Sequence, residues 1–167
     1  MPEGIPAERL QPSLLDRLTD DDPGRRTEAA ERNVISSSRL REIVLRDVSW
    51  LLGTGNLATS KDLSQWPEVV KSVVNYGLPD LSGLTIAKLD SATLALAVRQ
   101  AILDFEPRIL PRLLRVVTTN ERSDTDSRPL HFRIEGQLWS TPAPIRISFK
   151  TELDLESFRV NVTEQSG

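Results

Sequence analysis

The spacing of apolar residues changes once along this chain, and that change constrains the fold more than any other feature. Within residues 40–52 and 91–105 apolar residues recur every three or four positions, which is the spacing of one helix face. From residue 130 onward they alternate with polar residues, as in strands that bury one face. Helices followed by a run of strands predict an α+β fold.

Two main helices are predicted before the strands. Serines 36–38 can cap the first helix, and Gly53 follows its end. The second helix is expected from about 91 to 105, with Asp90 as its cap, and Pro107 ends it because a proline pushes the preceding residue out of the α region. The apolar stripe of the first helix consists of Leu40, Ile43, Val44, Val48, Leu51 and Leu52.

The strands are predicted at 130–138, 145–155 and 158–162, with a further strand at 114–119. They are expected to form a small, mostly antiparallel sheet on which the two main helices pack. Strand 158–162 comes last, so we expect it to be an exposed edge with Asn161 on its polar face.

Residues 1–35 differ from the rest of the chain, because prolines and a long polar run surround one short apolar cluster, Leu14, Leu15 and Leu18. This pattern predicts a flexible N-terminal arm that carries one helical turn, followed by a single domain over residues 36–163. A frayed terminus fits the composition equally well.

Composition excludes several classes of function. A net charge of −3 argues against nucleic acid as the main ligand, since binding to phosphates needs a basic face. With no cysteine and one histidine, the chain has no thiolate nucleophile and no typical zinc site, so we expect no metal and no cofactor. No apolar run is long enough to span a membrane, and the N-terminus lacks the pattern of a secretory signal, so a cytoplasmic location is expected.

Three features could carry chemistry, and each has a plainer explanation. Residues 53–58 match G-x-G-x-x-A, but they follow a helix, whereas a dinucleotide fingerprint follows a strand. His131, on the polar face of a strand, is better explained as a surface residue. Asp104 and Glu106 could serve as the paired carboxylates of a glycoside hydrolase, although a chain with 24 acidic residues offers many such pairs.

Glu106, Pro107 and Arg108 form a more suggestive group directly after the second helix. The rigid proline presents an acid and a guanidinium with little entropy to lose on binding. We expect both charges to be exposed in the free protein. Taken on these residues alone, an ordinary helix end with exposed charges is the favoured explanation.

Four segments in this order resemble the TssE family of type VI secretion baseplate proteins. They are residues 14–23, 40–52, 72–80 and the Glu-Pro-Arg motif, and the similarity covers about residues 12–162. The motif also resembles that of the wider family of phage baseplate wedge proteins, which are sometimes labelled lysozyme-like.

The resemblance implies a non-enzymatic structural subunit with a domain like the interlocking domain of sheath subunits. It implies that Glu106, Pro107 and Arg108 bind the core bundle formed by the wedge proteins TssF and TssG, and that the subunit starts the first sheath ring of TssB and TssC. The leucines of the arm, Leu14, Leu15 and Leu18, are expected to join the partner-binding surface. A peptidoglycan hydrolase, or a wedge protein of a phage-like contractile particle, is the alternative.

Overall fold

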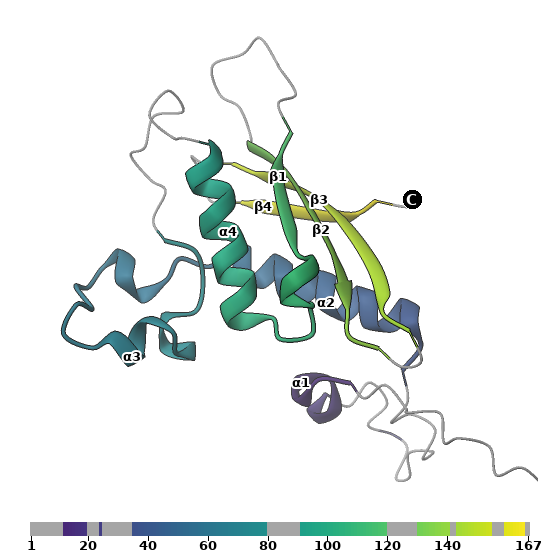
Figure 1. The fold of residues 1–167 in the computed structure, drawn as a ribbon. Helices are drawn as coiled ribbons and strands as arrows, with labels where there is room; N and C mark the ends of the chain where they lie inside the picture. Colours follow the sequence, from purple (N-terminus) through teal and green to yellow (C-terminus); the bar gives the residue numbers. More distant parts are fainter. Residues whose placement is uncertain are drawn as a thin grey trace, which may run out of the picture.

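The computed structural model describes residues 12–19, 24, 35–79, 91–119, 130–140, 143–154 and 159–165. Within these residues, two long helices accompany one four-stranded sheet (Figure 1). The helices are α1 (Leu14–Leu18), α2 (Ser37–Leu52), α3 (Pro67–Val70) and α4 (Ser91–Phe105). The 3₁₀ turns are η2 (Leu57–Thr59), η3 (Val73–Asn75) and η4 (Pro111–Leu113). The strands are β1 (Arg115–Thr118), β2 (Leu130–Leu138), β3 (Ile145–Leu153) and β4 (Val160–Glu164).

Helix α2 begins and ends where its capping residues predict. The hydroxyl of Ser36 accepts a hydrogen bond from the backbone N–H of Arg39, which satisfies one of the donors left open at a helix start. Gly53 forms the C-cap. All six residues of the predicted apolar stripe are buried. The first predicted helix is therefore confirmed.

Helix α4 also has the predicted bounds, although its expected cap, Asp90, lies outside the described residues. Leu94, Val98 and Ile102 form its buried side. Pro107 follows the end of the helix and prevents its continuation.

The sheet is antiparallel throughout, with strand order β1-β2-β3-β4, so β1 and β4 are its edges. Burial alternates along β2 and β3, and the register places Ile134 opposite Phe149 on the core side. The last strand is β4, slightly later than the predicted 158–162, and Phe158 lies outside the described residues. The predicted α+β fold is confirmed.

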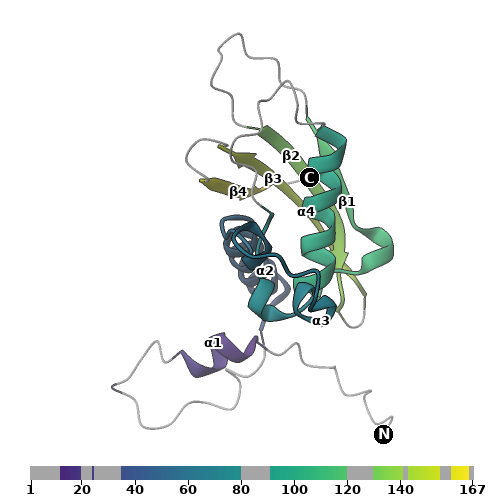
Figure 2. The ribbon, with the colours of Figure 1, turned by 90° about the vertical axis from the view of Figure 1, so that its left-hand side faces the viewer.

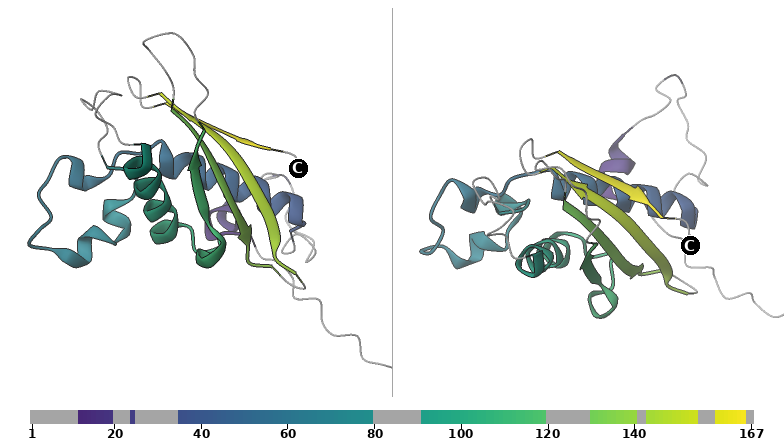
Figure 3. Two further views of the ribbon diagram at one scale, coloured as in Figure 1. Left: turned by 45° about the horizontal axis from the view of Figure 1, so that its top comes forward. Right: turned by 90° about the horizontal axis from the view of Figure 1, so that it is seen from above.

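Both long helices cover the same face of the sheet, α4 against β1 and α2 against β3 and β4 (Figure 3). Their buried residues join those of β2 and β3 in one apolar cluster. Figure 2 shows α1 below α2, so that α2 lies between α1 and the sheet. Helix α2 therefore belongs to the core on one side and faces α1 on the other.

The loop after α2 is fastened to the loop before α4. Leu78 exchanges two backbone hydrogen bonds of 2.8 Å, from its N–H to the Thr54 carbonyl and from the Asn56 N–H to its own carbonyl. Gly77 has a φ of 120°, and a Cβ there would lie 2.3 Å from the Thr54 carbonyl oxygen, so only glycine allows this approach. These contacts keep Tyr76 beside the end of α4, where its ring packs edge-on against the ring of Phe105.

Candidate functional site: the Glu-Pro-Arg segment and its ion-pair network

The Glu-Pro-Arg segment leaves α4 and is attached at once to the end of β2. The N–H of Glu106 still donates to the Ile102 carbonyl, as in the helix. Two residues after the proline, Ile109 forms an antiparallel bridge with Leu138. The segment is therefore fixed at both ends by backbone hydrogen bonds.

Glu106 is buried, with only 4% of its surface exposed, and this corrects the expectation that both charges of the motif are exposed. Its carboxylate accepts hydrogen bonds from the Nε of Arg108 at 2.6 Å, from Nη2, and from the backbone N–H of Arg108 at 3.2 Å. Burial and charge are compatible here because the arginine supplies a two-point ion pair. The arginine side chain itself is only 27% exposed.

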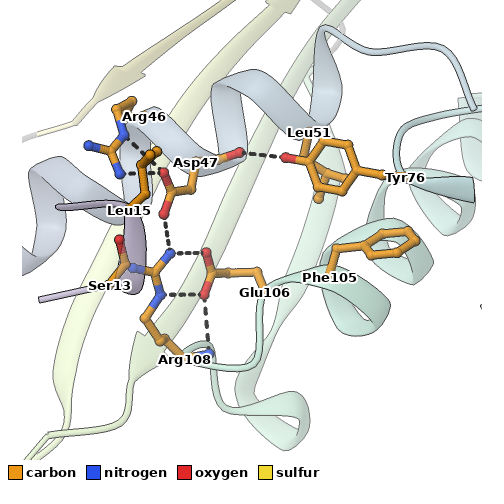
Figure 4. A pocket seen from close by; sticks show the side chains of 9 residues that line it. All are labelled: Ser13, Leu15, Arg46, Asp47, Leu51, Tyr76, Phe105, Glu106 and Arg108. Carbon is orange, nitrogen blue, oxygen red and sulfur yellow. Dashed lines mark hydrogen bonds and ion pairs between the residues drawn. The ribbon is translucent and has the colours of Figure 1, made fainter. Parts of the chain in front are cut away.

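Asp47 of α2 holds the other side of Arg108, through a 2.5 Å ion pair with Nη2 (Figure 4). Its second carboxylate oxygen accepts from Arg46, at 2.9 Å from Nε and 2.8 Å from Nη2. Arg46 in turn binds Asp16 of α1 at 2.5 Å. Five charged side chains thus form one continuous network from α1 through α2 to the Glu-Pro-Arg segment.

Hydrogen bonds in the network shift the pKa of Asp16, Arg46 and Arg108. Burial alone would lower the pKa of Arg108, but the bonds to Glu106 and Asp47 outweigh burial and raise it above its usual value. The bond from Arg46 lowers the pKa of Asp16, and the bond to Asp16 raises the pKa of Arg46. Both arginines are therefore held firmly in their charged form.

Helix α1 is attached to the rest of the protein through polar contacts. Its N-cap, Ser13, bonds the Asp16 side chain and accepts from the Asp16 N–H at 3.3 Å. None of its residues is buried, and its three leucines are exposed to 70% (Leu14), 50% (Leu15) and 74% (Leu18). A helix that turns its leucines to solvent leaves them available to another surface.

A pocket of about 240 Å³ lies between α1, α2 and the Glu-Pro-Arg segment. We call it the motif pocket. Its lining brings Leu15 together with Glu106 and Arg108, whereas Leu14, Leu18 and Pro107 do not line it. The remaining lining residues are Ser13, Arg46, Asp47, Leu51, Tyr76 and Phe105 (Figure 4).

Asp47 organises the site but is not among the site residues predicted from the sequence. A signal was present, because Asp47 lies on the helical row of Ile43 and Leu51, inside the apolar stripe of α2. A carboxylate on a buried helix face needs a cationic partner. The identity of that partner, Arg108, 61 positions later, could not be read from local spacing.

The residues considered for catalysis differ in their surroundings, and within the described part of the chain Asp104 does not line the motif pocket that Glu106 lines. Asp104 is exposed and accepts from Gln100 at 2.9 Å, whereas Glu106 is bound by Arg108. His131 lies 3.8 Å from Glu152 on the outer face of the sheet. Gly53 caps α2, so the glycines of 53–58 do not follow a strand.

The described part of the chain contains neither a cluster of metal ligands nor a membrane-spanning helix. No group of three or more histidine, aspartate or glutamate side chains in it is arranged to hold a metal ion. None of its helices combines the length and apolar character needed to cross a bilayer.

Comparison with known proteins gives one match. The family described as baseplate wedge protein gp25 matches residues 38–143, more than half of the chain. The matched range begins in α2, contains the Glu-Pro-Arg segment and continues past the end of β2. Comparison with curated proteins gave no match, and comparison with solved structures gave none either. The chain therefore belongs to the baseplate wedge protein gp25 family.

Proposed function

We propose that this chain is a non-catalytic, cytoplasmic subunit of a type VI secretion baseplate, docked with it at the inner membrane complex. In this role it joins the core bundle of TssF and TssG to the first sheath ring of TssB and TssC. Membership of a baseplate wedge family supports a structural role. The observation that carries the proposal is the ion-pair network, which holds Arg108 in the motif pocket together with the half-exposed Leu15 of α1.

The network supports binding because it removes most of the entropy that Arg108 would otherwise lose at an interface. An arginine prepared in this way, next to apolar side chains, is the kind of residue that dominates binding energy between proteins. We therefore propose Arg108, Leu14, Leu15 and Leu18 as wedge-contacting residues. Glu106 and Pro107 position the arginine.

The proposed contact with the sheath uses the edge strand β4. Beyond β4 the sheet has no further strand within the described residues, and its outer edge offers backbone groups for pairing. Addition of a strand from a sheath subunit would use these groups without disturbing the core.

Capture by co-expressed TssF and TssG tests the wedge contact. The wild-type chain should co-purify with the pair, and a variant with Leu14→Ser, Leu15→Ser and Leu18→Ser should lose most of the capture. These side chains are at least half exposed, so the variant should keep the wild-type melting temperature within about 2 °C. Arg108→Lys keeps the positive charge beside Glu106 but loses the planar guanidinium, which can bind several acceptors at once. This variant should also weaken capture. Full capture of both variants would refute the proposed surface.

A wedge protein of a phage-like contractile particle is a second candidate, and the description of the matched family favours it as directly. The same experiment separates the two. A folded wild-type chain that fails to bind TssF and TssG, but binds wedge proteins encoded beside it, belongs to such a particle.

A further inference from the structure

Trp139 lies directly opposite Arg108 across the short bridge that attaches the Glu-Pro-Arg segment to β2. The bridge pairs Ile109 with Leu138. Its two hydrogen bonds, both 2.8 Å, run from the Trp139 N–H to the Arg108 carbonyl and from the Leu110 N–H to the Gln137 carbonyl. In an antiparallel pair, the residue before Ile109 lies opposite the residue after Leu138. The backbones of Arg108 and Trp139 are therefore neighbours, with Cα atoms about 5.5 Å apart.

Trp139 leaves the bridge on the side away from the core. Ile109 and Leu138 are 1% and 0% exposed, so they point inward. Arg108 lies in a turn and directs its guanidinium to Glu106 and Asp47. Trp139 follows Leu138 at the end of a strand, and successive residues of an extended segment alternate, so Trp139 points outward. Trp139 is accordingly 59% exposed. A tryptophan placed in this way exposes a large rigid apolar surface, and tryptophan and arginine are the residues most enriched in binding hot spots.

Arg108 still has donors available for a partner. Of its five side-chain N–H groups, those on Nε and Nη2 bind Glu106 and Asp47. Among the described residues, no acceptor is bonded to Nη1, which therefore keeps two N–H groups.

The charge of the network selects the kind of acceptor. Three carboxylates, those of Asp16, Asp47 and Glu106, surround two guanidinium groups, so the network carries one net negative charge. A further carboxylate would be repelled by the three already present. A neutral acceptor, either a main-chain carbonyl or a side-chain amide, would gain the hydrogen bond without this repulsion.

We propose that Trp139 extends the wedge-binding surface of Arg108. The surface fits a partner segment that lays an apolar side chain on the indole and offers a neutral hydrogen-bond acceptor to Nη1. This inference rests on the proposed function, and it adds a residue outside the Glu-Pro-Arg motif together with the chemistry of the partner.

The full-length Trp139→Ala variant tests the inference by its affinity for the co-purified wedge pair. Binding should weaken by roughly 30-fold or more, the loss expected for a hot-spot residue, while the melting temperature stays within about 2 °C. Trp66→Ala is the matched control, because Trp66 is 56% exposed but lies at the start of α3, and it should bind within about twofold of wild type. Trp139→Phe should recover part of the loss.

Salt tests the kind of acceptor. The factor by which Arg108→Gln weakens binding should be the same at low and high salt, because a bond to a neutral acceptor is not screened. A factor that shrinks several-fold at high salt would show that the partner supplies a carboxylate, and would overturn that part of the proposal. The Trp139 variants test the contact with the indole separately, so their result stands even if Arg108→Gln does not fold.

The outcomes also separate this inference from the function on which it rests. If Arg108→Lys weakens capture and Trp139→Ala binds like wild type, the inference is wrong and the proposed function stands. If the folded wild-type chain is not captured at all, the proposed function is wrong, and the inference is overturned with it.

Discussion

Glu106 is buried, charged and close to the proposed wedge-contacting residue Arg108, so we expect its substitution to affect folding before it affects binding. The carboxylate receives three hydrogen bonds from Arg108 and is 4% exposed. An exposed acid at a helix end would contribute little to stability. A buried acid that neutralises an arginine contributes much more, because its removal leaves that arginine partly uncompensated.

Glu106→Ala should therefore lower the free energy of unfolding by about 3 kcal/mol, near the lower end for a broken buried ion pair. We choose the lower end because Arg108 keeps its contact with Asp47 and is partly exposed. Asp104→Ala, two positions earlier and exposed, is the control and should change the free energy by less than about 0.5 kcal/mol. Urea denaturation measures both. Equal, small effects would mean that the carboxylate is dispensable for folding.

Asp16 makes the attachment of α1 sensitive to acid. Its pKa is lowered in the folded state by the bond from Arg46, so the attachment is at full strength above the ordinary aspartate pKa of about 3.9. It should be lost as the pH falls below that value through the lower folded pKa.

The methyl NMR signals of Leu14, Leu15 and Leu18 should consequently stay constant between about pH 7 and 5 and should move only below about pH 4. In the Asp16→Asn variant, they should resemble the detached state at every pH. A transition of the wild-type signals near neutral pH would assign the attachment to another titrating group.

Among the elements, those with local sequence signals were predicted well. The cap at Ser36, the apolar stripe and Gly53 together define α2, and all three lie within the helix or next to it. The same holds for the alternation in β2 and β3. The 3₁₀ turns and α3 were not predicted, because each is short and depends on contacts such as the Asn75 side chain, which bonds Ala58 and Val70.

The site was predicted less completely, because it too depends on contacts between residues that are far apart in the sequence. The positions of Glu106, Pro107 and Arg108 next to a helix end follow from the sequence, but the burial of Glu106 does not. Asp47 and Arg108 lie 61 positions apart, and only the packing of α2 beside the end of α4 brings them together.

The direction of the backbone groups in β4 decides how its edge can be tested. The Gln165 N–H donates to Ser148 in β3, and the Arg159 carbonyl accepts from Asp154. Because the directions alternate, Asn161 also turns its N–H toward β3, whereas Val160, Val162 and Glu164 turn theirs outward. A proline at Asn161 would therefore break the sheet itself, and Glu164 is the better position.

Glu164→Pro should remove one outward donor and leave the pairing of β3 with β4 intact. If β4 pairs with the sheath, this variant should fold and enter the wedge, yet start sheath polymerisation poorly. Glu164→Ala, which loses the same 3.8 Å ion pair with Arg41 but keeps the N–H, should polymerise sheath normally. Electron microscopy of sheath assembled on purified baseplates provides the measurement. Normal sheath growth from Glu164→Pro would locate the contact elsewhere.

For the whole molecule, the arrangement of carboxylates predicts the absence of glycosidase activity. The two candidate acids have different surroundings. Asp104 is exposed and bonded to Gln100, whereas Glu106 is bound to Arg108 in the motif pocket, which Asp104 does not line. Hydrolysis needs two carboxylates on opposite sides of the scissile bond.

Purified protein should accordingly fail to clear a suspension of peptidoglycan between about pH 4 and 7, with lysozyme as the positive control. Turbidity measures the clearing. Clearing that disappears in both Asp104→Asn and Glu106→Gln would assign the protein to the hydrolases. Clearing that both variants retain would have to come from another carboxylate or from a contaminant.

Helix α2 touches both proposed binding surfaces. Arg41 lies 3.8 Å from Glu164 of the edge strand, and Asp47 holds Arg108, the proposed wedge-contacting residue. These residues are six positions apart, which corresponds to about 9 Å along the helix axis. A helix packed into the core changes this separation very little, so in the proposed function α2 would keep a fixed distance between the wedge contact and the sheath contact. In a closed ring, small errors in the angle of each subunit add up around the circle. A fixed separation between the two contacts would keep every subunit at the same angle.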